Sequence, residues 1–332
     1  MCCVGVTVAA GSVHETPSSA GAAYMLERLA FHETQNRGLG EIARSLEATG
    51  GKLGAEAGRE RMFYSYGALR ASMLLAVEEN YTADRLVLAA SGVNHQHLLD
   101  IAEPLLSDLP KGSPVNKPKS AYTGGDFRHK TDSEEKAAAI MNVMQTLMGG
   151  GNSFSSGCPG KGMQSRLYLR VMTEYDWMEA ISTFSTVYDD TGLFGIHLAA
   201  PSNSVAVAVD IAIRELTAIA KPGEVTEAEL SRAKNSTISS VLRNLESRKN
   251  HTEDIGRQLL IDSSGKSSQH FLERIDEVTL DDITSTAHKM LSSCPTMASL
   301  GDVDKVPTHE YVRKTIESPP SDLVWMLKSV FC

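Results

Sequence analysis

The order of strand-like and helical patterns constrains the fold of this chain more than any other sequence feature. The chain opens on Val4, Val6 and Val8, which alternate as in a β-strand, and a helical pattern follows at about 22–33. Strands and helices then mix without strict βαβ alternation, which favours an α+β fold over a doubly wound parallel sheet. The other elements expected in the first half are a helix at 38–49, a hairpin of strands at 52–58 and 60–68, a buried strand at 85–92 and a helix capped by Asn94.

The second half holds the clearer capping signals. Ser133 is expected to cap a helix through Met148, and Thr226 and Glu229 form a capping box before a helix that continues to about Arg248. The other expected elements are strands at 181–188 and 193–199, helices at 205–220 and from Thr279, and a strand at 296–300. The last strand resembles Leu86–Val93 in pattern and setting, so the halves are either a faint repeat or alike by chance.

Length and charge exclude several classes of protein. The 332 residues exceed the size at which one hydrophobic core stops growing, so two domains are expected. The net charge of −9 argues against a binder of nucleic-acid phosphates, because such proteins carry a basic excess. No run approaches the ~20 apolar residues of a membrane span, and the first residues show neither a secretory signal nor a presequence. The five cysteines include no CxxC pair, so neither a disulfide framework nor a thiolate zinc site is expected.

The most unusual segment is Gly149–Gly162, which contains six glycines in fourteen residues between two expected helices. The phosphate-loop pattern GxxxxGK[ST] fails because the chain has Ser155 and Gly162 where Gly and Ser or Thr are needed, and the dinucleotide pattern GxGxxG fails at Phe154. Two interpretations remain. The segment is a linker between helices, or it is a loop that offers backbone hydrogen bonds to an extended peptide.

At this segment the chain resembles a known family. The sequence from Gly149 to Tyr168 is similar to the glycine-rich loop of the alpha subunits of mitochondrial processing peptidases, those of plants above all. These subunits belong to the pitrilysin-type metallopeptidase superfamily. The resemblance covers nearly the whole chain to about Val312. It includes Tyr24–Phe31, Glu79–Gly92, Ile101–Pro110, Tyr188–Ile196, Asn244–Arg248 and Glu253–Gln258.

The resemblance implies a fold, a function and partners. The fold would be two related pitrilysin-like (LuxS/metallopeptidase-like) α+β domains, with an antiparallel or mixed sheet packed by helices. The chain would be a non-catalytic subunit that recognises basic presequence peptides and pairs with a catalytic beta subunit. Zinc would be held by that beta subunit, and this chain would hold no cofactor. The location would be the mitochondrial matrix or the matrix side of the inner membrane, where plant members also form core proteins of respiratory complex III.

The resemblance also assigns candidate substrate-binding residues. Asn152 and Cys158 replace glycines of the family loop, and both changes are expected to stiffen it. The candidate residues for contact with the presequence are Gly149, Gly150, Gly151, Ser153, Phe154, Gly157, Gly160, Lys161 and Gly162.

No catalytic or metal-ligating residue is expected in this chain. Catalytic members of the superfamily carry His-x-x-Glu-His on the first helix, where the two histidines share one face and bind zinc. The five matching positions here run from Tyr24 to Arg28, and they provide neither imidazole. Arginine stays cationic and cannot ligate a metal, so Glu27 is expected to pair with a cation or face solvent.

The chain also departs from the family in length. Several helices are expected to be missing between Arg70 and Asn80, and a strand and turn between Arg128 and Glu134. The expected organisation is a shortened first domain at 1–110, a proline-rich linker at 111–125, a second domain at 126–317 and an atypical tail at 318–332. Two alternatives stay open: a structural core subunit of complex III without processing activity, or a truncated form without function.

Overall fold

A computed structural model describes residues 2–15, 19–32, 38–68, 86–107, 134–150, 163–188, 192–262 and 268–318. The chain forms two compact units. The first contains residues 1–120 and Leu242–Lys266, and the second contains Ala121–Val241 and Ser267–Cys332. The chain therefore passes from the second unit back into the first within one helix, α6 (Glu227–Glu246).

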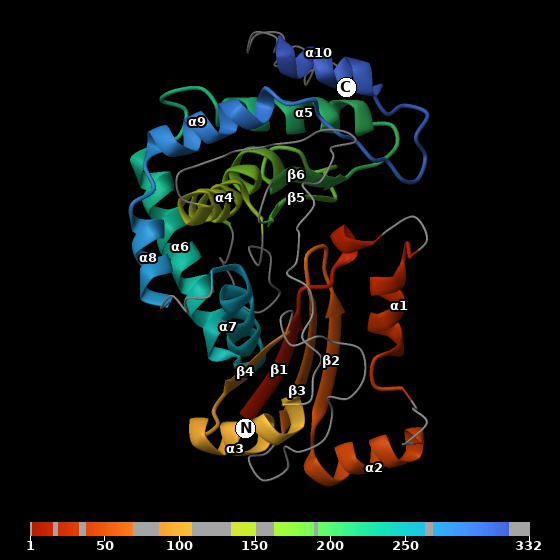
Figure 1. The fold of residues 1–332 in the computed structure, drawn as a ribbon. Coiled ribbons are helices and arrows are strands. Elements are labelled where there is room, and N and C mark those ends of the chain that lie inside the picture. Colours follow the sequence, from red (N-terminus) through yellow and green to blue (C-terminus); the bar gives the residue numbers. More distant parts are fainter. Residues whose placement is uncertain are drawn as a thin grey trace. The chain divides into compact units, whose positions relative to one another are not determined.

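The first unit is built on a four-stranded antiparallel sheet in the order β2-β3-β1-β4. β1 lies inside the sheet, and its register pairs Val6 with Tyr64 of β3 on one side and with Leu88 of β4 on the other. The sheet is drawn in red to orange in Figure 1. Its strands are β1 (Cys2–Val8), β2 (Lys52–Ala57), β3 (Met62–Ala68) and β4 (Leu86–Ser91).

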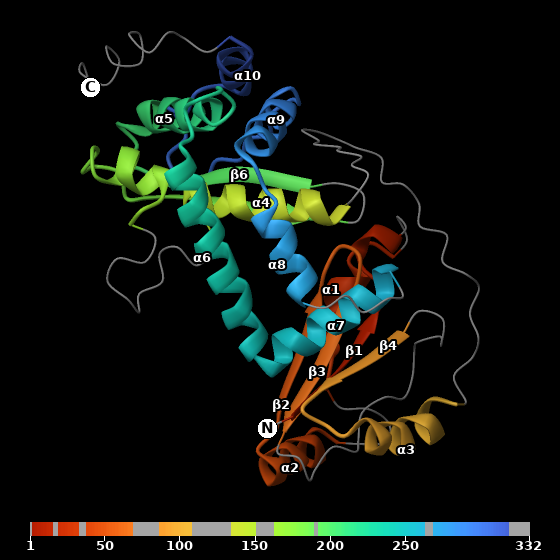
Figure 2. The ribbon, with the colours of Figure 1, turned by 90° about the vertical axis from the view of Figure 1, so that its left-hand side faces the viewer.

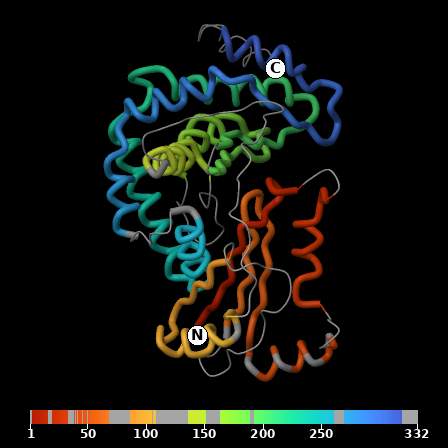
Figure 3. Tube along the Cα trace, viewed as in Figure 1, coloured from red at the N-terminus to blue at the C-terminus, as the bar shows by residue number. Residues whose placement is uncertain are grey.

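Helices accompany this sheet, and one of them comes from far along the chain. Helix α7 (Arg248–Asp262) packs against β1 and β4, and Figure 3 shows it in cyan beside these strands. A Cβ added at Gly256 would come within 2.2 Å of the Thr7 hydroxyl oxygen, so glycine permits this close approach. The other helices are a 3₁₀ turn at Ser12–His14, α1 (Ala22–Leu29), α2 (Leu39–Thr49) and α3 (His95–Leu106).

The second unit surrounds a larger apolar core. Helix α4 (Glu134–Met148) carries Val143, Met144 and Met148 into it with no exposed surface, and α4 packs on the antiparallel hairpin of β5 (Ala180–Val187) and β6 (Gly192–Ala199). Figure 2 shows the α4 and β5–β6 layer with helices around it. The remaining elements are a π-helix at Tyr168–Met172, α5 (Val205–Ala218), α6, α8 (Ser268–Asp276), α9 (Leu280–Leu291) and α10 (His309–Glu317).

The expected α+β class is confirmed, and so are the hairpins and the caps at Asn94, Thr226 and Thr279, whereas Ser133 lies outside the described residues. Asn94 accepts hydrogen bonds from the amides of Gln96 and His97, and Thr279 forms a capping box with Asp282. The strand expected at 296–300 is wrong, because this segment forms no ladder of hydrogen bonds with any described strand.

The expected domain boundaries are tested only in part. The expected linker at 111–125 lies outside the described residues, as does the tail beyond Ser318, so both stay predictions. The expected domains were continuous stretches of sequence, so the prediction missed that Leu242–Lys266 belong to the first unit. Within the described residues, no helix is long and apolar enough to cross a bilayer.

Candidate functional site

The N-terminal end of the glycine-rich segment is fixed to β5. Helix α4 ends at Met148, and the amides of Gly149 and Gly150 both donate to the carbonyl of Gln145, at 3.0 and 2.9 Å. Gly150 forms a parallel bridge with Thr183, whose amide donates to the Gly149 carbonyl at 3.2 Å. The Thr183 hydroxyl donates to the Gln145 carbonyl at 3.0 Å. The segment therefore leaves the core from a defined point on the sheet.

The two ends of the segment lie next to each other. Gly149 has a φ of +123°, and a Cβ added there would come within 2.8 Å of the Ser165 hydroxyl. A Cβ at Gly150 would come within 2.1 Å of the Thr183 carbonyl oxygen, so a larger residue would force β5 away. Glycine is required at both positions by close packing and, at Gly149, by backbone conformation. Gly149 and Ser165, which lie on either side of residues 151–162 in the sequence, are therefore close together.

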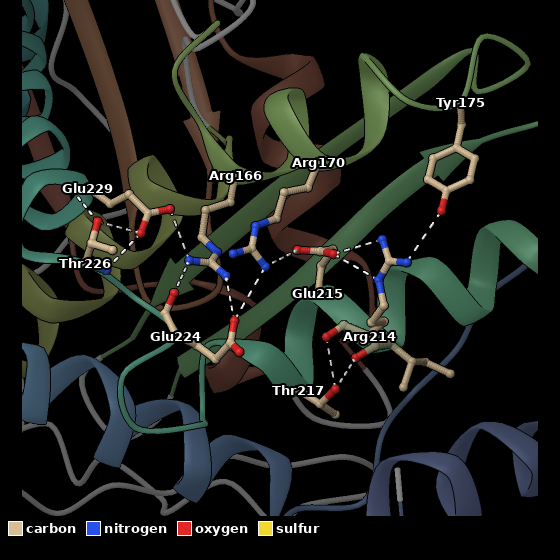
Figure 4. Close-up of polar contacts among 10 residues, drawn as sticks. Arg166, Arg170, Tyr175, Arg214, Glu215, Thr217, Glu224, Thr226 and Glu229 are labelled. Carbon is tan, nitrogen blue, oxygen red and sulfur yellow. Dashed lines mark hydrogen bonds and ion pairs between the residues drawn. The ribbon is translucent and has the colours of Figure 1, made fainter. Parts of the chain in front are cut away.

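The C-terminal end is fixed by a buried arginine. Arg166 is 2% exposed, and its Nη1 donates to the Glu224 carbonyl at 2.8 Å and to the Glu229 carboxylate at 3.1 Å. Its Nη2 lies 3.8 Å from the Glu224 carboxylate. Figure 4 shows the guanidinium between these two side chains. Glu229 also accepts from the amide and hydroxyl of Thr226, so the capping box at the start of α6 and the loop end share one carboxylate.

Further charged residues surround Glu215, which is 2% exposed, and together with Arg166, Glu224 and Glu229 they form one charged cluster. Its Oε1 accepts from Nε of Arg214 at 3.1 Å, and its Oε2 lies 3.8 Å from Arg170 of the π-helix. Arg170 also lies 3.6 Å from Glu224, and Arg214 donates to the Tyr175 hydroxyl at 3.4 Å. Three arginines thus face three glutamates, and their charges balance. Such a cluster is suited to holding chain segments in place rather than to acid–base catalysis.

The cluster changes the protonation of its members. Burial alone would raise the pKa of Glu229, but the Thr226 amide and the Arg166 guanidinium favour the carboxylate, and the net shift is downward. Burial lowers the pKa of Arg166, and the neighbouring Arg170 lowers it further, although arginine remains cationic at physiological pH. Glu229 therefore keeps its charge in acidic solution and continues to pair with Arg166.

Only two of the residues expected to bind the presequence are described. Gly149 and Gly150 lie together at the loop entry. The others lie outside the described residues: Gly151, Ser153, Phe154, Gly157, Gly160, Lys161 and Gly162. Sequence reasoning missed Arg166, Gln145 and Thr183 as anchors. A usable signal was present for Arg166, because a charged residue shortly after a glycine-rich run and next to apolar Leu167 must find a partner when buried.

The first-helix positions show how this chain replaces a metal-binding motif. The Arg28 guanidinium lies 5.2 Å from the centre of the Tyr24 ring, and its Nε donates to the Tyr24 hydroxyl at 3.2 Å. Glu27 accepts a hydrogen bond from the Ala57 amide of β2 at 2.9 Å, and its side chain is half-buried. Among the described residues, no group of three or more His, Cys, Asp or Glu side chains could hold a metal ion.

Comparisons with known families and structures agree on one fold. Residues 1–79 match the family described as insulinase (peptidase family M16), and residues 69–237 match the peptidase M16 inactive domain. The crystal structure of a protease from Helicobacter pylori superposes with a TM-score of 0.68 at 15% identity, covering 87% of this chain and 90% of that protein. At that identity the likeness supports the fold alone.

Curated relatives are closer in sequence. The mitochondrial-processing peptidase subunit alpha of Solanum tuberosum is 40% identical, over 95% of this chain and 81% of its own length. A probable alpha-1 subunit of Arabidopsis thaliana is 38% identical, over 93% of this chain and 79% of its own length. The alignment with the potato protein covers 406 positions, 74 more than the 332 residues of this chain. The alignment therefore contains at least that many positions at which the potato protein has a residue and this chain has a gap.

Proposed function

This chain belongs to peptidase family M16, and on that premise we propose that it acts as the non-catalytic, presequence-recognising subunit of a mitochondrial processing peptidase. The relatives that carry the name of that enzyme's alpha subunit support the assignment. So does the match to the inactive domain of the family, which covers half of the chain. The first-helix positions agree, because Tyr24 and Arg28 bind each other where a catalytic subunit needs two imidazoles.

The anchored ends of the glycine-rich segment carry the proposal for how the substrate is bound. Gly150 is paired with Thr183 of β5 before the segment, and Arg166 is bound to Glu224 and Glu229 after it. A loop with fixed ends loses less conformational freedom on binding than a free linker, so its glycine backbone can bond an extended peptide at lower cost. The residues proposed to make this contact are Gly149–Gly151, Ser153, Phe154, Gly157 and Gly160–Gly162.

The proposal names partners of defined chemistry. The catalytic zinc would be held by a beta subunit, which this chain would complement. The substrate would be a basic presequence, and the net charge of −9 favours its approach at low ionic strength. The site of action would be the mitochondrial matrix or the matrix face of the inner membrane.

Reconstitution with a plant beta subunit tests this function. Cleavage of a fluorogenic presequence peptide is measured with the beta subunit alone, with this chain added, and with a variant carrying Gly157→Ala, Gly160→Ala and Gly162→Ala. We expect this chain to stimulate cleavage and the variant to raise KM several-fold while changing kcat little. The reason is that Cβ atoms restrict the loop and cover its backbone.

A matched control separates loop chemistry from a general effect of losing glycines. Gly38→Ala with Gly40→Ala alters positions where an added Cβ meets nothing within 4 Å, and cleavage should be unchanged. Equal KM values for the loop variant and the control would refute the role of the loop. Stable association with the beta subunit without any stimulation would instead favour the structural role in complex III.

A further inference from the structure

The second strand of the hairpin is paired along both edges in the first unit, but along only one edge in the second unit among the described residues. In the first unit, β3 pairs with β2 on one edge and with β1 on the other, and Met62, Phe63 and Ser65 are buried. β1 in turn pairs with β4, so one strand joins the hairpin to the last strand of the sheet.

In the second unit that joining strand has no counterpart among the described residues. β6 pairs with β5 over Gly192–Ala199, and no backbone hydrogen bond from the described residues reaches its other edge. None of the β6 residues is fully buried, although the strand reads Gly-Leu-Phe-Gly-Ile-His-Leu-Ala. The segment Thr296–Leu300, whose sequence resembles β4, is likewise unpaired, and Leu300 is fully exposed.

We propose that the open edge of β6 binds an extended peptide segment of another polypeptide as an additional antiparallel strand. The direction follows from the first unit, where β1 runs antiparallel to the corresponding strand β3. β1 lies just before α1, so the corresponding segment of this chain would lie just before α4. The sequence of residues 120–133 contains only three apolar residues, Ala121, Tyr122 and Phe127, and no alternating pattern, so it does not predict a matching strand there.

The chemistry of β6 suits such an addition. Natural edge strands often carry charged residues or proline, which prevent pairing with other chains, and β6 contains neither. Phe194, Ile196 and Leu198 point to the apolar core and are only partly buried, so a neighbouring strand with apolar residues at alternate positions would complete their burial. Because the chain carries a net charge of −9, cationic side chains at the remaining positions of the peptide should favour binding.

Two N-methylated peptides test this inference on the intact chain. The parent is a fluorescent eight-residue peptide that alternates valine and lysine, and each derivative carries N-methyl groups on one alternate set of amides. A peptide strand paired with β6 directs only one alternate set of its amides toward β6. We therefore expect one derivative to bind at least about tenfold more weakly than the parent and the other to bind equally, as read by fluorescence anisotropy.

Hydrogen exchange locates the binding on the protein. Every second amide of Gly192–Ala199 should exchange rapidly in the free chain and become protected when the parent peptide is added. The inference is overturned if both derivatives bind equally, if the parent does not bind at millimolar concentration, or if these amides are already protected without peptide. It is also overturned if they become protected with rising protein concentration, which would indicate pairing between two copies. The triple alanine variant of the glycine-rich loop should bind the parent peptide as the unchanged chain does. The two tests are therefore independent, and a negative result for β6 would leave the proposed function unaffected.

Discussion

Arg166 shows what one buried charge contributes to this molecule. Its guanidinium is removed from water, which costs free energy, and this cost is offset only by the Glu224 carbonyl and the carboxylates around it. The position is just after a segment rich in glycine, where the backbone has little preference of its own. One side chain therefore fixes the chain a few residues after the glycine-rich segment.

Arg166→Met should destabilise the second unit by about 3 kcal/mol, because it leaves the Glu229 carboxylate and the Glu224 carbonyl without their buried cationic donor. The matched control is Arg170→Met, which removes a cation that is 41% exposed and makes only ion pairs of 3.6 and 3.8 Å. That change should cost less than about 1 kcal/mol. Urea denaturation of both variants measures the difference, and equal losses would show that burial of Arg166 has no special role.

The pKa of Glu253 in α7 is shifted upward, opposite to the downward shift at Glu229. Burial raises its pKa, and the nearby Glu56 raises it further, against the lowering effect of Arg61 and Lys249. A carboxyl whose pKa is higher in the folded than in the unfolded state costs stability once it ionises, and the cost vanishes below its ordinary pKa of about 4.3. Glu253→Gln should therefore raise Tm at pH 7 and leave it unchanged near pH 3.5. A variant that lowers Tm at pH 7 would contradict this account.

At the scale of elements, α7 is the segment that sequence patterns did not predict. The helix expected from Thr226 to about Arg248 is confirmed as α6, and α7, which follows it and packs on β1 and β4, has no counterpart among the expected elements. Its sequence has weak amphipathicity and contains charged residues on most faces, so the helical period gives little signal. The elements that were predicted, such as α4 and the β5–β6 hairpin, have strong apolar patterns and clear turn or cap residues.

Gly256 is expected to control how closely α7 approaches β1. Gly256→Ala places a methyl group 2.2 Å from the Thr7 hydroxyl oxygen, which is buried and has no hydrogen-bond partner among the described residues. We expect a loss of about 1–3 kcal/mol despite the better helix propensity of alanine. Thr7→Ala combined with Gly256→Ala should recover part of it in a double-mutant cycle, whereas Gly40→Ala, in open space, should not destabilise. Additive effects of Thr7→Ala and Gly256→Ala would show that the two residues do not contact.

At the scale of the whole molecule, the first unit is not contiguous in sequence. Residues 1–120 contain its sheet, but the helix that packs on β1 and β4 comes from Leu242–Lys266. Helix α1 also leaves Tyr24, Met25 and Leu29 more than half exposed, so little other apolar cover is present among the described residues of this unit.

A fragment of residues 1–120 should therefore show no cooperative thermal unfolding by circular dichroism. The same fragment joined by a glycine-serine linker to residues 242–266 should unfold cooperatively, because the added helix covers the apolar sheet. A matched fusion carrying a scrambled 242–266 sequence controls for added length. Cooperative unfolding of the fragment alone above about 60 °C would contradict the dependence on α7.

Sequence patterns were enough to predict the α+β class, the two hairpins, the caps at Asn94, Thr226 and Thr279, the family, and the lack of paired imidazoles at Tyr24 and Arg28. These depend on local patterns and residue chemistry, which a linear sequence contains. Three features emerged only from the folded chain: α7 packs on the first sheet, Arg166 is buried against Glu224 and Glu229, and 296–300 is not a strand. The physical reason is that these outcomes depend on partners distant in the chain: a helix is buried, a charge compensated and a strand paired only by what lies beside it.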